Sequence, residues 1–247
     1  MAGHSKWAQI KRKKAVTDKR RGQLFSKLLK EITVAAKIGG SDPAGNARLR
    51  TAIQEAKSGN VPNDNIDRAV RRGAGELDGV AYQEITYEGY GAGGAAILVE
   101  AVTDNRNRTA AEVRHLFSKF GGNLGEGGCV AWMFDKRGYF AFEKTSLQEE
   151  EFMELALELE VDDLSSDDEV HELFSPPERY AEVREALAAK EHAPVASELA
   201  MLPKNYVELS AEQLQSVLKL VEGLEDLDDT QNVWTNVDVG AAVALAG

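Results

Sequence analysis

Apolar residues in the first third of the chain recur at helical spacing. Between residues 17 and 38 they form one stripe, made of Leu24, Leu28, Ile32 and Ala35. We expect Gly39 to end this helix, because glycine readily adopts the left-handed conformation that often follows a helix. A second helix is expected from Asp42, acting as its N-cap, to Gly59. A third is expected over residues 63–72, so the pattern predicts a small three-helix bundle.

After Gly75 the pattern changes to the alternation typical of strands. Tyr87 and the apolar residues 96–102 predict a hairpin with a glycine-rich turn. Three glycines of this turn also satisfy the dinucleotide-binding pattern G-x-G-x-x-G, namely Gly89, Gly91 and Gly94. In a dinucleotide fold a helix follows these glycines, whereas here a strand follows. We therefore assign them to the positive φ angles of a hairpin turn and expect no cofactor.

Four pairs of residues have the spacing of a helix capping box, in which Ser or Thr is followed three positions later by Glu or Gln. The pairs are Thr109 with Glu112, Ser146 with Glu149, Ser175 with Glu178, and Ser210 with Gln213. Each pair predicts the start of one helix. Further strands are expected over residues 130–134, 139–142, 169–174, 195–201 and 230–237. This mixed order predicts an α+β body, and two small split βαβ units account for it best.

Charge is distributed unevenly along the 247 residues, whose net charge is -12. Residues 1–73 hold 17 basic and 6 acidic side chains, a net charge of +11, and the rest of the chain carries -23. A basic head on an acidic body indicates a nucleic-acid partner more readily than the overall charge does. The competing interpretation is a surface whose charges are uneven only for solubility.

The basic side chains of the head gather near its beginning, beside a tryptophan. Lysines and arginines along such a segment can each displace counterions from phosphates, and Trp7 offers a face on which a base can stack. A mitochondrial presequence is also rich in arginine and is the competing interpretation. The candidate nucleic-acid-binding residues of the head are Lys6, Trp7, Lys11, Arg12, Lys13, Lys14, Lys19, Arg20, Arg21, Arg68, Arg71 and Arg72.

Two further arginines, Arg106 and Arg108, lie directly before the helix predicted to be capped at Thr109. Two guanidinium groups beside a helix N-terminus favour binding of a phosphate or another anion. An exposed polar connector accounts for the same residues equally well. We include both arginines among the candidate nucleic-acid contacts.

Several classes of protein are disfavoured by what the sequence lacks. The single cysteine, Cys129, cannot form an intramolecular disulfide or a CxxC metal site. The four histidines lack the spacing of metal ligands, and neither a nucleophile elbow nor a Walker loop occurs. We expect no metal, no cofactor and no catalytic activity. No apolar run of about 18 residues occurs, so we expect a cytoplasmic protein without a membrane partner.

One short sequence keeps an enzymatic alternative open. Gly121, Gly122 and Asn123 are similar to the GGQ loop of release factors, which act on peptidyl-tRNA. Asn123 stands where that loop has Gln, and no general base accompanies it. We therefore expect no turnover.

Several long motifs in a fixed order resemble the YebC family, which includes the mitochondrial translational activator of cytochrome c oxidase. The motifs are MAGHSKW at residues 1–7, RGQLF at 21–25, VPNDNIDRAVRRG at 61–73, YEGYGAGG at 87–94, DNRNRTAAEVRHLFSKFGGNLG at 104–125 and SVLKLVEGLEDLDD at 216–229. The resemblance covers the chain essentially from end to end. Since the sequence starts directly at MAGHSKW, it looks like the bacterial form, without an organelle presequence.

The resemblance implies an α+β fold with an N-terminal three-helix domain followed by two small ferredoxin-like α+β domains, one inserted in the other. We accordingly expect a basic helical domain at residues 1–76, a discontinuous α+β domain at residues 77–137 and 205–247, and an inserted acidic α+β domain at residues 138–204. It also implies a regulator of gene expression, usually described as a DNA-binding transcriptional regulator. Some members act instead in translation at the ribosome. Because backbone charge is common to DNA and RNA, the residues leave both partners, and the oligomeric state, open.

Overall fold

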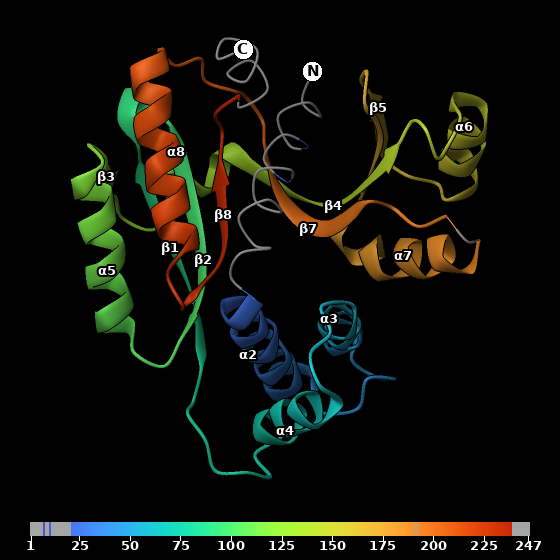
Figure 1. The fold of residues 1–247 in the computed structure, drawn as a ribbon, viewed down its shortest axis with the longest axis horizontal. Helices are drawn as coiled ribbons and strands as arrows, with labels where there is room; N and C mark the ends of the chain where they lie inside the picture. Colours follow the sequence, from blue (N-terminus) through green and yellow to red (C-terminus); the bar gives the residue numbers. More distant parts are fainter. Residues whose placement is uncertain (1–6, 8–9, 11–20, 191, 239–247) are drawn as a thin grey trace. The chain divides into compact units, whose positions relative to one another are not determined.

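The computed structural model describes residue 7, residue 10 and residues 21–190 and 192–238. The chain divides into two compact units (Figure 1). One unit includes Val16–Ala131 and Leu209–Thr235 and holds the helical region and a first sheet. The other includes Trp132–Glu208 and holds a second sheet, together with Trp7 and Ile10.

Three helices build the helical region, as the apolar pattern predicted. They are α2 (Arg21–Gly39), α3 (Ala47–Ser58) and α4 (Asn63–Gly73). Their apolar faces share one core that includes Ile32, Leu49 and Ile66. Helix α2 runs through Gly39, one residue further than predicted, and Gly40 follows with a φ of 89°. The predicted beginning of this helix at residues 17–20 lies outside the described residues.

The predicted start of the second helix at Asp42 is wrong, because Asn46 is the N-cap. The side-chain oxygen of Asn46 accepts a hydrogen bond from the amide of Leu49 at 3.1 Å. Its side-chain nitrogen donates to the carbonyls of Ala35 and Gly40, both at 2.8 Å. Asp42 instead accepts from the amide of Ala44 in a separate turn. Asn46 therefore joins the end of α2 to the start of α3, and Gly59 caps α3 as predicted.

The first sheet has four antiparallel strands in the order β3-β1-β2-β8. The strands are β1 (Gln83–Tyr90), β2 (Ala96–Thr103), β3 (Asn123–Leu124) and β8 (Thr230–Thr235). Two helices, α5 (Arg106–Lys119) and α8 (Ala211–Glu225), lie side by side over one face of the sheet (Figure 1). They pack closely, since a Cβ on Gly223 of α8 would lie 3.2 Å from Leu116 of α5.

The predicted β1–β2 hairpin is confirmed, and its glycines serve different purposes. Gly93 and Gly94 adopt φ angles of 68° and 79° in the turn, which favour glycine. Gly91 has a φ of -86° and Gly89 lies within β1, so the predicted positive φ is wrong for both. At Gly89 the requirement is space, because a Cβ would lie 2.5 Å from the carbonyl oxygen of Asn123.

The second sheet is also antiparallel, in the order β5-β6-β4-β7. Its strands are β4 (Phe134–Glu143), β5 (Asp163–Ser166), β6 (Val170–Ser175) and β7 (Ala196–Pro203). Helices α6 (Glu149–Glu158) and α7 (Tyr180–Ala189) pack on one face, around Phe140, Phe142 and Leu173. The chain order βαββαβ with this strand order is the ferredoxin-like arrangement, and the α+β fold class is confirmed.

The first sheet has the same spatial arrangement with one change of chain order. Strand β1 has the inner position in the first sheet that β6 has in the second sheet, but β1 comes first in the chain. The remaining elements follow in the expected sequence β2, α5, β3, α8 and β8, with the whole second sheet between β3 and α8.

Only one of the four predicted capping boxes forms, the one between Ser210 and Gln213. Helix α5 begins three residues before Thr109, with Asn105 as its N-cap. Helix α6 follows Gln148 rather than Ser146, and a short 3-10 turn (Pro177–Arg179) separates Ser175 from α7.

The predicted strand at residues 130–134 is also wrong for all but its last residue. A 3-10 turn spans Ala131–Met133, and β4 begins at Phe134. The amides of Val130 and Ala131 cannot join a sheet ladder, because both donate hydrogen bonds to the carboxylate of Glu88.

Candidate nucleic-acid interface

Part of the predicted nucleic-acid interface lies outside the described residues, namely Lys6, Lys11, Arg12, Lys13, Lys14, Lys19 and Arg20. Arg21 is the first residue of α2. Trp7 belongs to the unit of the second sheet, and its indole nitrogen donates a hydrogen bond to the carboxylate of Glu169 at 2.9 Å. The indole is half-buried, so its predicted role in stacking on a base stays a prediction.

Helix α4 carries the three remaining arginines of the head on its solvent side. Ile66 and Ala69 turn towards the helical core, whereas Arg68, Arg71 and Arg72 are exposed. The helix is held tightly against α2, since a Cβ on Gly73 would lie 2.4 Å from the carbonyl oxygen of Thr33. This packing fixes the position of the arginine-bearing side of α4.

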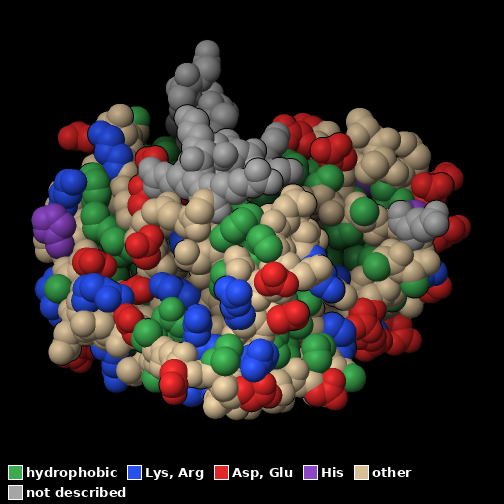
Figure 2. Space-filling view, turned by 60° about the horizontal axis from the view of Figure 1, so that its bottom comes forward, with side chains coloured by type: hydrophobic (Ala, Val, Ile, Leu, Met, Phe, Trp, Pro, Cys, Tyr) green, Lys and Arg blue, Asp and Glu red, His purple; other side chains and the backbone are tan. Residues whose placement is uncertain are grey.

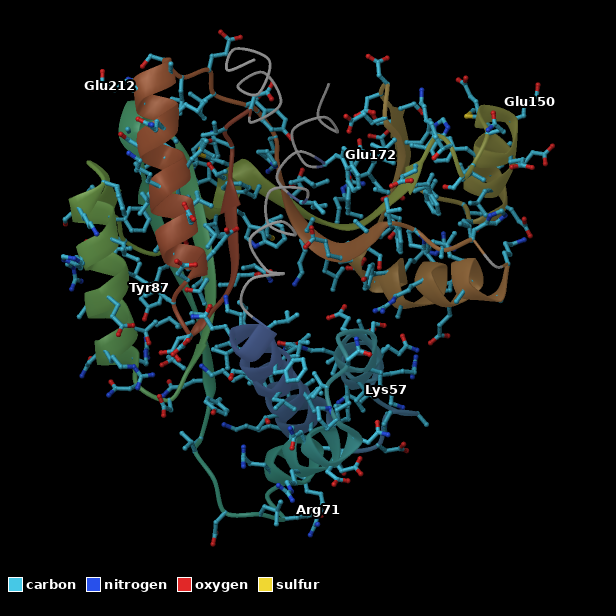
Figure 3. All side chains as sticks on the ribbon, in the orientation of Figure 1. Lys57, Arg71, Tyr87, Glu150, Glu172 and Glu212 are labelled. Carbon is cyan, nitrogen blue, oxygen red and sulfur yellow. The ribbon has the colours of Figure 1, made fainter. Side chains whose placement is uncertain are left out.

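The three arginines of α4 differ in their polar contacts. Arg71 forms an exposed ion pair with Glu76 at 3.2 Å, and its side chain lies at the outer side of α4 (Figure 3). The aliphatic part of Arg72 packs against Gly79, where a Cβ would lie 2.6 Å from the side chain. Neither Arg68 nor Arg72 forms an ion pair or a side-chain hydrogen bond within the described part of the chain. Their guanidinium groups are therefore available to an anionic partner.

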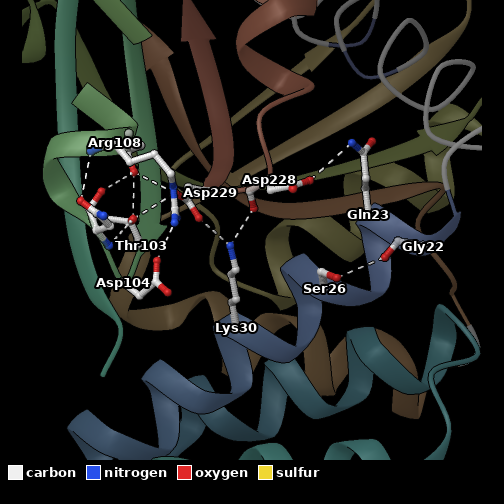
Figure 4. Close-up of polar contacts among 11 residues, drawn as sticks. Gly22, Gln23, Ser26, Lys30, Thr103, Asp104, Arg108, Asp228 and Asp229 are labelled. Atoms are coloured by element: carbon white, nitrogen blue, oxygen red, sulfur yellow. Dashed lines mark hydrogen bonds and ion pairs between the residues drawn. The ribbon is translucent and has the colours of Figure 1, made fainter. Parts of the chain in front are cut away.

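The lysines of α2 hold the helical region to the end of α8 and to the segments that precede β1 and β8. Lys27 donates to the carbonyl of Glu225 at 2.7 Å, and Lys37 donates to the carbonyl of Tyr82 at 3.1 Å. Lys30 donates to the carbonyl of Asp228 at 2.9 Å and to the carboxylate of Asp229 at 2.8 Å (Figure 4). A large share of the positive charge on α2 is therefore engaged within the protein.

Asp229 is the centre of a buried polar cluster at the start of β8 (Figure 4). Besides Lys30, its carboxylate accepts hydrogen bonds from the guanidinium of Arg108 at 2.6 Å and from the hydroxyls of Thr103 and Thr109 at 2.9 and 2.8 Å. Burial alone would raise the pKa of Asp229, but these four donors outweigh burial and hold the pKa well below its usual range. Asp229 is therefore ionised in the folded protein at neutral pH.

The predicted pair Arg106 and Arg108 separates into two different roles. Both lie in the first turn of α5 and are exposed. The guanidinium of Arg108 also contacts Asp104 at 2.8 Å, so two carboxylates neutralise it. The side chain of Arg106 forms no hydrogen bond or ion pair with any described residue, and only its carbonyl accepts a hydrogen bond, from Tyr87. Of the two, Arg106 retains a free guanidinium.

The solvent side of α5 contains basic residues that the sequence analysis did not single out. Arg114, His115 and Lys119 are exposed, while Val113 and Phe117 are buried. Their signal was present in the helical period, since each lies one or two positions from a buried residue. Figure 2 shows Lys and Arg interspersed with Asp and Glu on the face that it presents, rather than gathered in one continuous patch.

A glycine-rich loop follows β3 and is anchored by a buried carboxylate. The two oxygens of Glu88 accept hydrogen bonds from the amides of Gly128, Val130 and Ala131, at 2.7 to 2.8 Å. Burial would raise the pKa of Glu88, but the three amide donors lower it below its ordinary value. Its polar atoms are thus used to shape the loop.

Neither a metal site nor a membrane span is found in the part of the chain that is described. Its His, Cys, Asp and Glu residues form no group of three or more that could hold a metal ion. Within the same residues, no helix has both the length and the apolar character needed to cross a bilayer.

The chain is similar to proteins of one family along its length. Residues 5–76 match the family described as the TACO1/YebC protein N-terminal domain, and residues 82–237 match the TACO1/YebC second and third domain. A protein of Trichlorobacter lovleyi is 52% identical over 98% of this chain and 97% of its own length. A protein of Natranaerobius thermophilus is 53% identical over the full length of both chains. Both are named "Probable transcriptional regulatory protein".

A solved structure is also similar to this one. The crystal structure of a conserved hypothetical protein from Aquifex aeolicus superposes with a TM-score of 0.81. The two sequences are 46% identical, and the match covers 88% of this chain and 90% of the other.

Proposed function

The chain belongs to the TACO1/YebC family, and from this premise we propose that it is a cytoplasmic, nucleic-acid-binding regulator of gene expression that acts on DNA. The names of its relatives from Trichlorobacter lovleyi and Natranaerobius thermophilus support a regulatory role. A regulator of this kind needs a basic surface that faces away from its own core.

The observation that carries this proposal is the outward side of α4. Arg68 and Arg72 are exposed, and neither is engaged by an acidic side chain in the described residues. Their spacing of four positions places both on one side of the helix, about 6 Å apart along its axis. Each phosphate that a guanidinium group contacts releases condensed counterions, which favours binding. Two free guanidinium groups on one side of the helix can therefore act together on a phosphate backbone.

Arg106 on α5 is the second described group in the proposed interface. It lies at a helix N-terminus, where the helix dipole favours an anion. Arg108 is assigned a different role, because its guanidinium already pairs with Asp104 and Asp229. The predicted contacts at residues 6, 11–14, 19 and 20 remain part of the proposal on the strength of their charge.

We also propose that the protein has no catalytic activity. The sequence Gly121-Gly122-Asn123 leads into the edge strand β3, in which Asn123 pairs with Tyr90 of β1. A Cβ on Gly122 would lie 2.6 Å from the carbonyl oxygen of Tyr90, so Gly122 is needed for the close approach of two backbones. The close approach of two backbones therefore explains the glycine-rich sequence, and no action on peptidyl-tRNA is needed to explain it.

The test is to remove the two free charges of α4 in the full-length protein. We expect Arg68→Gln/Arg72→Gln to weaken binding to duplex DNA and to reduce the slope of log affinity against log salt by about 1.8, at about 0.9 per phosphate contact. The control is Lys136→Gln/Lys219→Gln, which removes two exposed charges from β4 and α8. The control should bind DNA as the wild type does. If Arg68→Gln/Arg72→Gln also binds DNA as the wild type does, the proposed interface is wrong.

The choice between DNA and RNA is made in the same titration. Duplex DNA, duplex RNA and purified ribosomes are compared at equal salt concentration. Tighter binding to DNA supports the proposal. Binding to ribosomes that exceeds binding to DNA, and that persists after DNase treatment, would replace it with a translation factor that binds RNA.

A further inference from the structure

Helix α6 presents large apolar side chains to solvent. The side chain of Leu157 is 77% exposed and that of Met153 is 44% exposed. The two residues are four positions apart and are therefore neighbours on one side of the helix. The opposite side buries Phe152, Leu155 and Ala156 in the core of the second sheet. Helix α6 thus has a second apolar side, formed by Met153 and Leu157, besides the side that packs in the core. We call this second side the apolar ridge.

A third exposed leucine lies on the edge strand of the same sheet. Leu164 of β5 is 38% exposed and pairs directly with Leu173 of β6. Residues directly opposite each other in an antiparallel pair project to the same face, and Leu173 is buried in the core that α6 covers. Leu164 therefore projects from the helix-covered face, at the outer edge of the sheet.

Carboxylates surround the apolar ridge. Helix α6 has the sequence EEEFMELALE, with five glutamates and no basic residue. Glu158 is paired with Lys190 at 2.5 Å, whereas Glu150 and Glu154 form no ion pair with any described residue. Glu150 lies at the outer side of α6, turned away from the sheet (Figure 3). Glu150 and Glu154 are exposed and lie within one helical turn of Met153 or Leu157.

This combination determines the chemistry of an occupant. Apolar side chains of this size are stabilised by removal from water, so the ridge favours a partner with apolar side chains of its own. The uncompensated carboxylates repel nucleic acid and attract cations. A basic amphipathic helix has both properties, and pairs of its residues at i and i+4 match the spacing of Met153 with Leu157 and of Glu150 with Glu154.

We propose that the outward side of α6, formed by Glu150, Met153, Glu154 and Leu157, is a docking surface for a basic amphipathic helix of a protein partner. The surface is distinct from the arginines of α4, so the inference does not depend on the proposed nucleic-acid partner. A protein that has both surfaces can bring a nucleic acid and a protein together.

The test uses the full-length protein and a fluorescently labelled amphipathic helical peptide of leucine and lysine, about 14 residues long. Fluorescence anisotropy is measured at about 0.15 M salt, where long-range attraction between exposed charges is largely screened. We expect Leu157→Gln to weaken binding at least about tenfold, because central apolar contacts dominate such interfaces. Since Leu157 is mostly exposed, this variant should keep the thermal stability of the wild type.

Two control variants change residues of the same types elsewhere in the unit that contains α6. Leu199→Gln removes another exposed leucine, which is 37% exposed on β7, and should leave binding unchanged. Glu150→Gln/Glu154→Gln should weaken binding by about tenfold, with a smaller salt dependence, whereas Asp168→Asn/Glu178→Gln should change it less than about twofold.

The outcomes are decisive in each direction. The proposal is supported when only the α6 variants weaken binding. It is overturned if Leu157→Gln binds the peptide as the wild type does, or if the control pair of acidic residues weakens binding equally, because the attraction would then be general. Sedimentation equilibrium of the protein alone gives the remaining outcome. A dimer that Leu157→Gln converts to a monomer would make a second copy of the chain the occupant and would also overturn the proposal.

Discussion

The guanidinium of Arg108 lies 2.6 Å from the carboxylate of Asp229, although 121 residues separate the two in the sequence. Arg108 is in the first turn of α5, and Asp229 directly precedes β8. Because Lys30 of α2 binds the same carboxylate, one buried charge connects the helical region with α5 and with the end of the first sheet at which β2 ends and β8 begins. An aspartate at this position therefore contributes to the arrangement of three elements.

Replacement of Asp229 by Asn should destabilise the protein by about 3 kcal/mol, because it leaves Lys30 and Arg108 facing a neutral group in a largely buried site. The control Asp104→Asn removes the more exposed partner of Arg108 and should cost only about 0.5 kcal/mol. Chemical denaturation at pH 7, followed by circular dichroism, measures both. Equal stability of the two variants would contradict the assigned role of Asp229.

The same carboxylate predicts a dependence of stability on pH. The pKa of Asp229 is lowered in the folded protein, and its unfolded value is about 3.9. Its stabilising contribution is therefore complete above about pH 5 and is lost as the pH falls through the unfolded value towards the lowered pKa. The free energy of unfolding of the wild type should decrease across this range more steeply than that of Asp229→Asn. Parallel curves for the two proteins would show that Asp229 contributes nothing in this window.

Arg106 and Arg108 should respond differently to substitution. Arg108→Gln removes hydrogen bonds to two carboxylates and should lower the free energy of unfolding by about 1.5 to 3 kcal/mol. Arg106→Gln should change stability by less than about 0.5 kcal/mol. It should instead reduce the salt slope of nucleic-acid binding by about 1, as expected for one phosphate contact. A stable Arg108→Gln protein with reduced binding would reverse the two assignments.

Glu88 should control the order of the glycine-rich loop. Glu88→Gln replaces one of the two acceptor oxygens by a donor, so at least one amide among Gly128, Val130 and Ala131 loses its partner. The expected cost is about 1 to 3 kcal/mol. Hydrogen exchange should accelerate at these amides, whereas Glu126→Gln, an exposed change in the same loop, should leave their rates unaltered.

The capping box of α8 gives a prediction about local stability. Ser210 accepts a hydrogen bond from the amide of Gln213, and the side chain of Gln213 accepts one from the amide of Ser210. Ser210→Ala should lower the free energy of unfolding by about 1 kcal/mol. Ser146→Ala should cost less than about 0.5 kcal/mol, since Ser146 does not cap α6. Similar losses in both variants would show that the cap is not the cause.

The elements that the sequence predicted well are those whose signals are local. The hairpin, the stripe of α2 and the cap at Ser210 each depend on residues within a few positions of one another. Thr109 shows why the other capping pairs failed. Asn105 caps the same helix four residues earlier, and the hydroxyl of Thr109 is used by Asp229, which is 120 residues distant.

The positions of the candidate contact residues follow from the sequence to different degrees. The helical period accounts for the exposure of Arg68, Arg71 and Arg72, because buried Ile66 and Ala69 define the inner side of α4. Charge alone could not separate Arg106 from Arg108, since their difference depends on a carboxylate far along the chain. Arg114 and Lys119 lie inside the predicted helix and face solvent by its period, so the sequence did carry their signal.

The position of β8 in the first sheet also bears on how the protein is synthesised. Asp229 accepts a hydrogen bond from the hydroxyl of Thr103, the last residue of β2, and lies 126 residues further along the chain. Because β8 directly follows Asp229, the first sheet lacks this edge strand until that distant stretch of the chain has left the ribosome. All four strands of the second sheet are translated earlier, between Phe134 and Pro203. Nascent chains should therefore form the second sheet first, while the backbone groups along one edge of the apolar strand β2 are still unpaired. Over that interval the growing polypeptide is most open to aggregation and to capture by chaperones.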